Sequence, residues 1–210
     1  MQKTIDALFL WGVKSRNAIV FFLTCVIWCT AAVLLLGSYA TAVHNPYAIA
    51  FYDFARDCGE YAIVLFILVS IPGIARRFQF QHKLIMLVMM FRRQLGILTY
   101  MFVLIHSMIL RIVPWLMKEY PVLPMEIFIL CGICANALLF LLFITSNDWS
   151  VKKLGDWWGK IHDLMYVIVW CIFAHVALQS IGTWTVLIGA TALLQLASHI
   201  YATKRLRSMN

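Results

Sequence analysis

The sequence has few charged residues. Asp, Glu, Lys and Arg together make up only 12% of its 210 residues, whereas hydrophobic residues make up 63%. In a soluble domain about a quarter of all residues are usually charged. A disordered chain is poor in large apolar side chains. The polar side chains are therefore too few to coat a water-soluble globule, and the composition excludes both a soluble domain and a disordered chain.

Two other patterns are missing. The apolar runs are continuous, whereas the strands of a membrane β-barrel alternate apolar and polar residues. The ten glycines are scattered along the chain, whereas a dinucleotide fingerprint or a P-loop needs several glycines at fixed spacing before a helix. We therefore expect an all-α membrane protein, and we expect any nicotinamide chemistry to take place on another protein.

Six apolar runs approach or reach the length of about 20 residues that a helix needs to cross a membrane. We expect a single transmembrane domain over residues 1–210, a six-helix bundle with spans at about 18–40, 58–75, 94–113, 122–145, 161–180 and 184–203. The stretch 3–42 has features of a signal peptide, but its apolar run exceeds the usual 7–15 residues or so, so we expect an uncleaved span. The apolar stretch 84–91 is too short to cross and is either an interfacial piece or an early start of the third span.

The basic residues predict the orientation of this bundle. If the N-terminus is cytoplasmic, 14 of the 17 Lys and Arg residues lie on the cytoplasmic side, and only Arg56, Arg111 and Lys118 lie outside. We therefore expect both termini in the cytoplasm and a multi-pass membrane protein. The net charge of +8 then reflects this orientation, and we expect membrane lipid rather than nucleic acid as a partner. The outer loops, residues 44–56 and 112–121, are short and offer a docking edge rather than a catalytic domain.

Two of the six histidines lie inside spans, where ionisable residues are costly and usually functional. His106 is 13 residues past Arg93 on the third span, and His175 is 15 residues past Lys160 on the fifth. Both spans run outward, so the two side chains share one depth, about 20 Å from the inner charges. Two facing imidazoles are what a b-type haem needs as axial ligands. The alternative is two unrelated histidines bonded to neighbouring polar groups, and spacing alone leaves both open.

His162 lies at the inner mouth of the fifth span. On a straight helix it would point about 140° away from the face of His175, so it faces the bundle only if the helix is distorted or begins later. The third span has Arg92 at the corresponding level, so a second bis-histidine haem has no evident second ligand. Four cations surround this level and could bind an anionic cofactor such as haem propionates or a flavin phosphate: Arg92, Arg93, Lys153 and Lys160. Ordinary positive-inside charge is the alternative explanation, and it is the simpler one for most of these residues.

Other candidates have simple structural explanations beside the functional ones. Cys131 and Cys134 form a C-x-x-C within the fourth span, which is either a helix contact of small residues or a membrane dithiol. Arg111, beyond His106, could pair with haem propionates or extend to lipid phosphates. Gly59 and Gly96 permit the close approach of a helix or a cofactor.

The stretch 92–96, followed by His106, resembles the third span of the ferric-reductase-like transmembrane family. The segment Lys153–His175 is similar to a branch of that family, the haem-bearing membrane subunits of bacterial periplasmic methionine-sulfoxide reductase systems. It shares with them the order basic-Leu-Gly, Trp158, His162, Tyr166 and a final His. The likeness covers roughly residues 45–180.

The resemblance implies one haem b between the third and fifth spans, with His106 and His175 as iron ligands, and leaves open a second haem and an FMN at the inner side near His162. It implies electrons that arrive from a cytoplasmic flavin reductase or from quinol and leave to a periplasmic molybdopterin-dependent reductase of the methionine-sulfoxide type. The resemblance therefore implies an electron-transfer subunit of the bacterial inner membrane rather than a self-sufficient enzyme. Two alternatives remain: a thiol-disulfide membrane protein that uses Cys131 and Cys134, and a transporter or scaffold without a cofactor.

Overall fold

The computed structural model describes residues 2–118 and 126–209, and in these residues it is entirely helical. The helices are, in chain order, α1 (Gln2–Lys14), α2 (Arg16–Ala42), α3 (Ala48–Arg77), α4 (Lys83–Met90), α5 (Arg92–Ser107), the π-helical turn η1 (Met108–Ile112), α6 (Val113–Leu116), α7 (Ile127–Ile144), α8 (Asp148–Leu154), α9 (Asp156–His162), α10 (Met165–Gln179) and α11 (Thr183–Met209).

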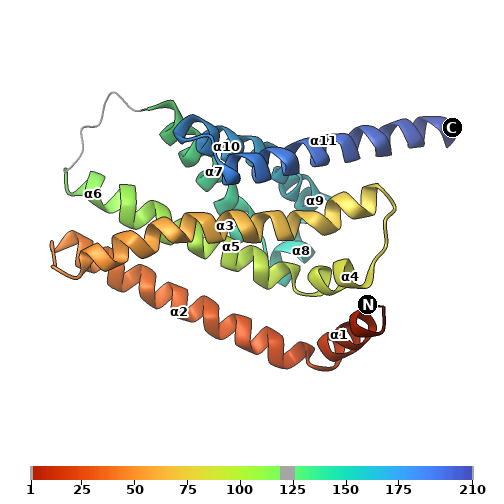
Figure 1. Cartoon of the computed structure of the whole chain (residues 1–210), viewed down its shortest axis with the longest axis horizontal. Coiled ribbons are helices and arrows are strands. Elements are labelled where there is room, and N and C mark those ends of the chain that lie inside the picture. Colours follow the sequence, from red (N-terminus) through yellow and green to blue (C-terminus); the bar gives the residue numbers. More distant parts are fainter. Residues whose placement is uncertain (1, 119–125, 210) are drawn as a thin grey trace.

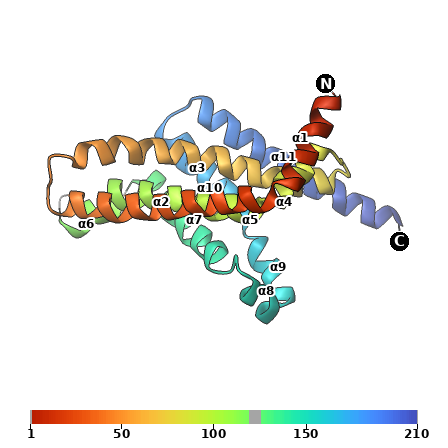
Figure 2. The same cartoon turned by 90° about the horizontal axis from the view of Figure 1, so that it is seen from below.

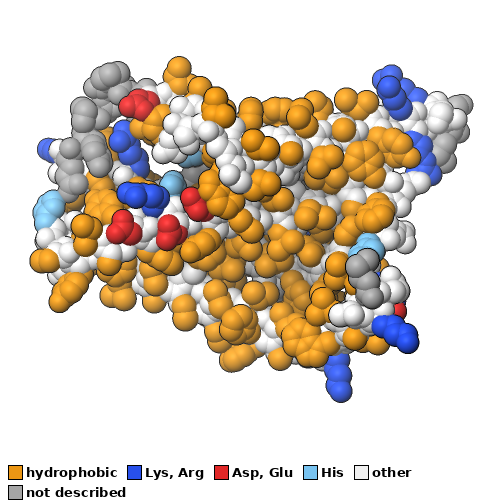
Figure 3. Space-filling model, viewed as in Figure 1, with side chains coloured by type: hydrophobic (Ala, Val, Ile, Leu, Met, Phe, Trp, Pro, Cys, Tyr) orange, Lys and Arg blue, Asp and Glu red, His pale blue; other side chains and the backbone are white. Residues whose placement is uncertain are grey.

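Six of the described helical segments are long and apolar enough to cross a membrane: Arg16–Ala42, Ala48–Arg77, Arg92–Leu116, Ile127–Ile144, Asp156–Gln179 and Thr183–Ser208. Hydrophobic side chains cover the middle of the visible face, and charged side chains gather towards its two ends (Figure 3). This distribution is expected when the belt between the two charged ends is surrounded by lipid. The protein is therefore a multi-pass membrane protein.

The boundaries differ from the sequence expectations in three places. The second span begins at Ala48 instead of about residue 58, so most of the loop expected over 44–56 is helix, because charged residues lower the hydropathy of a helix end without ending the helix. The stretch 84–91 forms a separate short helix, α4, and not the start of the third span. The expected start of the fourth span, residue 122, lies outside the described residues, and α7 begins at Ile127.

The spans pack in two helix pairs. α3 lies along α5, and α7 lies along α10, while α11 contacts both α3 and α10 and α2 covers α5 (Figures 1 and 2). An apolar cluster joins α3, α5, α7, α10 and α11 in the interior, and it is built from Phe66, Val69, Tyr100, Leu139, Met165, Ile168, Val169, Ile188 and Ala192. Burial of such side chains and close helix packing give each span a defined rotation about its own axis.

The two ends of the bundle differ in charge. We call one the basic end: there α3 finishes with Arg76 and Arg77 and α5 begins with Arg92 and Arg93. Both chain termini lie at this end (Figure 1). The opposite end is where α2 joins α3.

Candidate functional site

The structure brings His106 and His175 together. His106 lies in α5 and His175 in α10, and their ring centroids are 6.4 Å apart with the ring planes at 87°. Both residues are partly buried. The two residues therefore share one depth in the bundle, as their spacing from the basic residues predicts.

Backbone carbonyls hold one nitrogen of each ring. His106 Nδ1 lies 3.0 Å from the carbonyl oxygen of Ala55, and His175 Nδ1 lies 2.7 Å from that of Phe128. A carbonyl oxygen only accepts hydrogen bonds, so Nδ1 carries the proton in both neutral rings. The other nitrogen, Nε2, is then the one with a lone pair that can bind a metal.

Each ring also lies directly against a glycine. A Cβ atom on Gly59 would meet His106 Nδ1 at 2.8 Å, and one on Gly132 would meet His175 Nδ1 at the same distance, 2.8 Å. Real Cβ atoms essentially never approach a neighbour this closely. The close approach expected at Gly59 is therefore present, whereas a Cβ atom on Gly96 would have no neighbour within 4 Å.

A π-helical turn, η1, begins two residues after His106. The backbone N–H of Val113 donates to the carbonyl of Met108, five residues earlier, where an α-helix would use a partner four residues earlier. Such turns are rare and occur often at functional sites. Arg111 lies in this turn and is partly buried.

His162 occupies a break in the fifth span. α9 ends at His162 and α10 begins at Met165, so the straight-helix angle between His162 and His175 does not apply. His162 Nε2 lies 3.2 Å from Thr145 Oγ1, and its ring stacks on Trp158 with centroids 4.1 Å apart. The indole N–H of Trp158 donates to the Thr145 carbonyl at 2.9 Å, so these three side chains form one unit.

This unit faces a cavity of about 410 Å³ at the basic end. Arg92, Arg93 and His162 line the cavity, as do the backbone and side chains of α3, α5, α7 and α10 around them. Arg92 is partly buried, and Arg93 is exposed. Lys153 and Lys160 do not line the cavity: both are exposed, and the Lys160 ammonium lies over the Trp157 ring at 4.3 Å.

Arg93 has a partner outside the cavity. Its guanidinium lies 2.5 Å from an Asp148 carboxylate oxygen. The hydrogen bond and the charge of Arg93 hold the pKa of Asp148 below its ordinary value. Arg92 and Arg93 are thus adjacent in sequence but differ in environment, because successive helical residues point about 100° apart.

Several further polar residues that the sequence did not single out as site residues also line the cavity. Arg76 and Arg77, at the end of α3, line it together with Gln195 of α11. Gln195 is only 3% exposed, and its side-chain oxygen has no hydrogen-bond partner in the described part of the chain. The paired arginines at the end of the second span were a visible signal, since they mirror Arg92 and Arg93, but Gln195 carried none.

Arg77 is held by its neighbours on two other helices. Its Nε donates to Ser198 Oγ at 2.8 Å, its guanidinium donates to the Tyr166 hydroxyl, and it lies over the Tyr166 ring at 4.9 Å from the centroid. These contacts tie α3 to α10 and α11 beside the cavity.

The cysteines of the fourth span are both reduced. Cys131 is partly buried and Cys134 is exposed, and neither is in a disulfide. Cys131 directly precedes Gly132, so the C-x-x-C motif adjoins the glycine that contacts His175.

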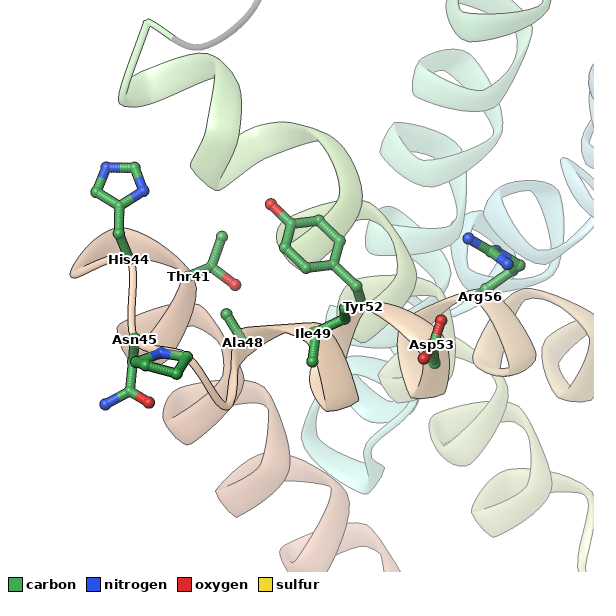
Figure 4. Close-up of a pocket in the computed structure, with 9 residues that line it drawn as sticks. Thr41, His44, Asn45, Ala48, Ile49, Tyr52, Asp53 and Arg56 are labelled. Carbon is green, nitrogen blue, oxygen red and sulfur yellow. The ribbon is translucent and has the colours of Figure 1, made fainter.

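A second cavity, of about 650 Å³, lies at the opposite end where α2 meets α3 (Figure 4). Asp53 and Arg56 of α3 line it, together with His44 and Asn45 of the connection. The residues expected to bind a cofactor do not line it. This cavity is therefore separate from the histidine pair and from the basic end.

Comparison with known proteins places these residues in a family context. A family model described as ferric reductase like transmembrane component matches residues 58–174. The protein-methionine-sulfoxide reductase heme-binding subunit MsrQ of Rhizobium meliloti is 34% identical over 93 residues, which cover 42% of this chain and 43% of that protein. MsrQ of Brucella ovis is 31% identical over 97 residues, which cover 45% and 44%. The matched region thus spans less than half the length of these relatives. No solved structure matches the chain.

Proposed function

We propose the function of this chain from one premise: it belongs to the ferric reductase like transmembrane family, whose model matches residues 58–174. We propose that it is a membrane electron-transfer subunit that binds haem b between α5 and α10. In this proposal His106 and His175 are the two axial ligands of the iron. The names of the similar MsrQ proteins, which describe heme-binding subunits, support this proposal.

The observation that carries the proposal is the separation of the two rings. Two metal–nitrogen bonds of about 2.0–2.1 Å, together with the half-width of each ring, separate two imidazole centres on one metal by about 6 Å. The centroids of His106 and His175 are 6.4 Å apart. This agreement in ring separation supports the proposal that the two histidines bind one metal ion between them.

The donor chemistry fits haem as well. Both rings have Nδ1 bonded to a carbonyl, which fixes the tautomer with Nε2 as the metal-binding nitrogen and raises its basicity. A bound haem supplies one-electron chemistry. The residues of this chain hold two imidazoles at one depth, and the surrounding apolar cluster of Ile105 and Ile109 limits the access of water.

We propose that the basic end faces the cytoplasm of a bacterial cell and that the protein lies in the inner membrane. Both termini are at this end, and the paired arginines of α3 and α5 are there too. Cytoplasmic segments of membrane proteins typically carry an excess of Lys and Arg, so the basic residues at this end support this orientation. The histidine pair then lies nearer the outer surface.

We propose that the basic-end cavity binds an anionic redox cofactor, either FMN or a second haem through its propionates. Arg76, Arg77 and Arg92 provide the positive charge, and the buried Gln195 oxygen offers a hydrogen-bond acceptor. His162, held by Thr145, is the residue of this cavity that would contact the cofactor ring. Electrons would arrive here from a cytoplasmic flavin reductase or from quinol.

We propose that the acceptor is a periplasmic oxidoreductase of the methionine-sulfoxide reductase type, with a molybdopterin cofactor. The support is the printed name of the MsrQ relatives. The chain would then act as the electron-transfer subunit of a two-protein system rather than as a self-sufficient enzyme.

A reduced-minus-oxidised spectrum of the purified protein, with haem quantified per chain, tests the proposal. We expect a b-type spectrum in the native protein and loss of haem in both His106→Ala and His175→Ala. The matched control is His82→Ala, because His82 lies at the start of α4, outside the six spans, where it accepts a hydrogen bond from Leu84 N–H. A colourless native protein, or full haem content in both ligand variants, would overturn the proposal.

Two further variants separate the alternatives. Loss of about half of the haem in His162→Ala would assign the basic-end cavity to a second haem, and loss of flavin instead would assign it to FMN. The double variant Cys131→Ser/Cys134→Ser should keep its haem spectrum. Electron transfer that needs these cysteines but neither His106 nor His175 would establish the thiol-disulfide alternative instead.

A further inference from the structure

The two histidines of the pair are held by the same arrangement, a glycine and a backbone carbonyl of a neighbouring helix. This arrangement occurs in two different helix pairs. His106 of α5 lies against Gly59 of α3, and His175 of α10 lies against Gly132 of α7. α3 packs along α5 and α7 along α10, so each ring meets the helix that is the main neighbour of its own helix.

The contact of each ring with its glycine is equally close. A Cβ atom on Gly59 would lie 2.8 Å from His106 Nδ1 and 2.9 Å from Cε1. A Cβ atom on Gly132 would lie 2.8 Å from His175 Nδ1 and 2.9 Å from Cε1. Because each of these short distances joins an imidazole ring to an atom attached directly to the backbone, any side chain at either position would displace the imidazole.

The hydrogen-bond acceptor occupies the same position relative to the glycine in both arrangements. Ala55 precedes Gly59 by four residues, and Phe128 precedes Gly132 by four. Their carbonyls are the oxygens bonded to Nδ1 of His106 and His175, at 3.0 and 2.7 Å. In an α-helix this is the carbonyl that the glycine N–H itself uses, and its second lone pair can accept the ring N–H. The missing side chain is what lets the ring reach that oxygen.

We propose that Gly59 and Gly132 are positioning residues that set the tautomer and the orientation of the two axial imidazoles. Each glycine admits its ring to the carbonyl one turn earlier, and the hydrogen bond then directs Nε2 towards the space between α5 and α10. This inference rests on the proposed haem function, and it adds that two residues which touch neither iron nor substrate determine the ligand geometry.

The stability of the protein without haem tests the steric part of this proposal independently of any cofactor. We expect Gly59→Ala to lower the thermal stability of the haem-free protein and to have little further effect in the background His106→Ala, where the clashing ring is absent. The same double-mutant cycle applies to Gly132→Ala and His175→Ala. Mutations in contact are non-additive in this way, whereas independent ones add. Additive effects in both cycles would overturn the proposal.

The haem-bound protein tests the orientation of the two imidazole rings. We expect Gly59→Ala and Gly132→Ala to bind haem about 10–100-fold more weakly, the usual effect of losing a hydrogen-bond partner of a metal ligand. We expect the haem that remains to have a higher midpoint potential, because the hydrogen bond of Nδ1 is weakened. We also expect an altered electron paramagnetic resonance signal, since near-perpendicular imidazole planes give a highly anisotropic low-spin ferric signal and a rotated ring changes it.

The control is Gly189→Ala. A Cβ atom there would meet Phe173 Cε2 at 2.9 Å, so this variant introduces a clash of similar size between two helices without touching a histidine. If it changes the potential and the resonance signal as much as Gly59→Ala and Gly132→Ala do, the positioning role is wrong. If His106→Ala and His175→Ala retain haem, the haem function itself fails, and the apoprotein cycle still decides the steric role of the glycines.

Discussion

The guanidinium of Arg77 donates a hydrogen bond of 2.8 Å to the hydroxyl of Ser198, which is fully buried in α11. The contact connects the last turn of α3 to the last span, and Ser198 in turn donates to the carbonyl of Gln195. Gln195 lines the basic-end cavity. One side of this cavity is therefore braced by a charged hydrogen bond between two spans.

We expect Arg77→Met to destabilise the protein by about 1.5–3 kcal/mol, the range for hydrogen bonds to charged groups. The reason is that Ser198 and Tyr166 both lose their donor, while Met keeps most of the aliphatic packing. Reversible unfolding in detergent measures the change. The control is Arg76→Met, because Arg76 is exposed, and an equal loss in both variants would contradict the expectation.

The proposed ligand role of His175 predicts the outcome of a ligand exchange. We expect His175→Met to retain part of the haem and to raise its midpoint potential, because Met/His ligation favours the reduced iron relative to two histidines. A redox titration followed by optical absorption measures the shift. An unchanged potential with full haem content would mean that His175 is not a ligand.

The two arginines at the start of α5 should differ in function. Arg92 is partly buried in the cavity, whereas Arg93 is exposed and paired with Asp148. We expect Arg92→Gln to weaken binding of the anionic cofactor proposed for the basic end at least several-fold and Arg93→Gln to change it little. Bound flavin or the second haem, quantified per chain, is the measurement. Equal losses in both variants would indicate a diffuse electrostatic effect instead of a site.

The ion pair between Arg93 and Asp148 predicts a specific pH dependence. Arg93 lowers the folded-state pKa of Asp148, so the pair stabilises the fold above the unfolded Asp pKa of about 3.9 and loses this effect as the pH falls through the lower folded value. The effect is small because Asp148 is exposed. We expect the difference in melting temperature between the native protein and Asp148→Asn to be present at neutral pH and to shrink in acid. A difference that grows in acid would contradict this.

The proposed orientation predicts which loops are accessible from outside the cell. In a background with all six cysteines replaced, Asn45→Cys should react with a membrane-impermeant maleimide in intact cells, because Asn45 joins α2 to α3 at the opposite end. Gln81→Cys, between α3 and α4 at the basic end, should react only after permeabilisation. The reverse pattern would overturn the orientation.

Much of the architecture could be predicted from composition and run length. The apolar runs alone predict six spans, because the membrane imposes a minimum length that is visible in any window of sequence. The helix starts were less predictable. The ten residues from Ala48 to Asp57 include charged side chains yet are helical, since a helix can extend beyond the hydrocarbon and solvate its charges there.

The depth of the candidate-site residues in the bundle could be predicted from the sequence. The direction in which each helix presents its side chains could not. Similar distances from Arg93 and Lys160 put His106 and His175 at one level, and the structure has their ring centroids 6.4 Å apart. The same reasoning grouped Lys153 and Lys160 with Arg92, but neither lysine lines the cavity, because the side of a helix that faces a neighbour depends on packing and not on position along the axis.

The sequence by itself determined that this chain has six apolar segments long enough to cross a membrane and two histidines at a common depth, because hydrophobic length and helical rise are properties of each segment alone. Only the tertiary structure decided that Gly59 and Gly132 receive those rings, that the fifth span breaks after His162, and that Arg76, Arg77 and Gln195 line the basic-end cavity. These features depend on how helices distant in sequence rotate and pack against one another, and close packing of the whole bundle selects that arrangement.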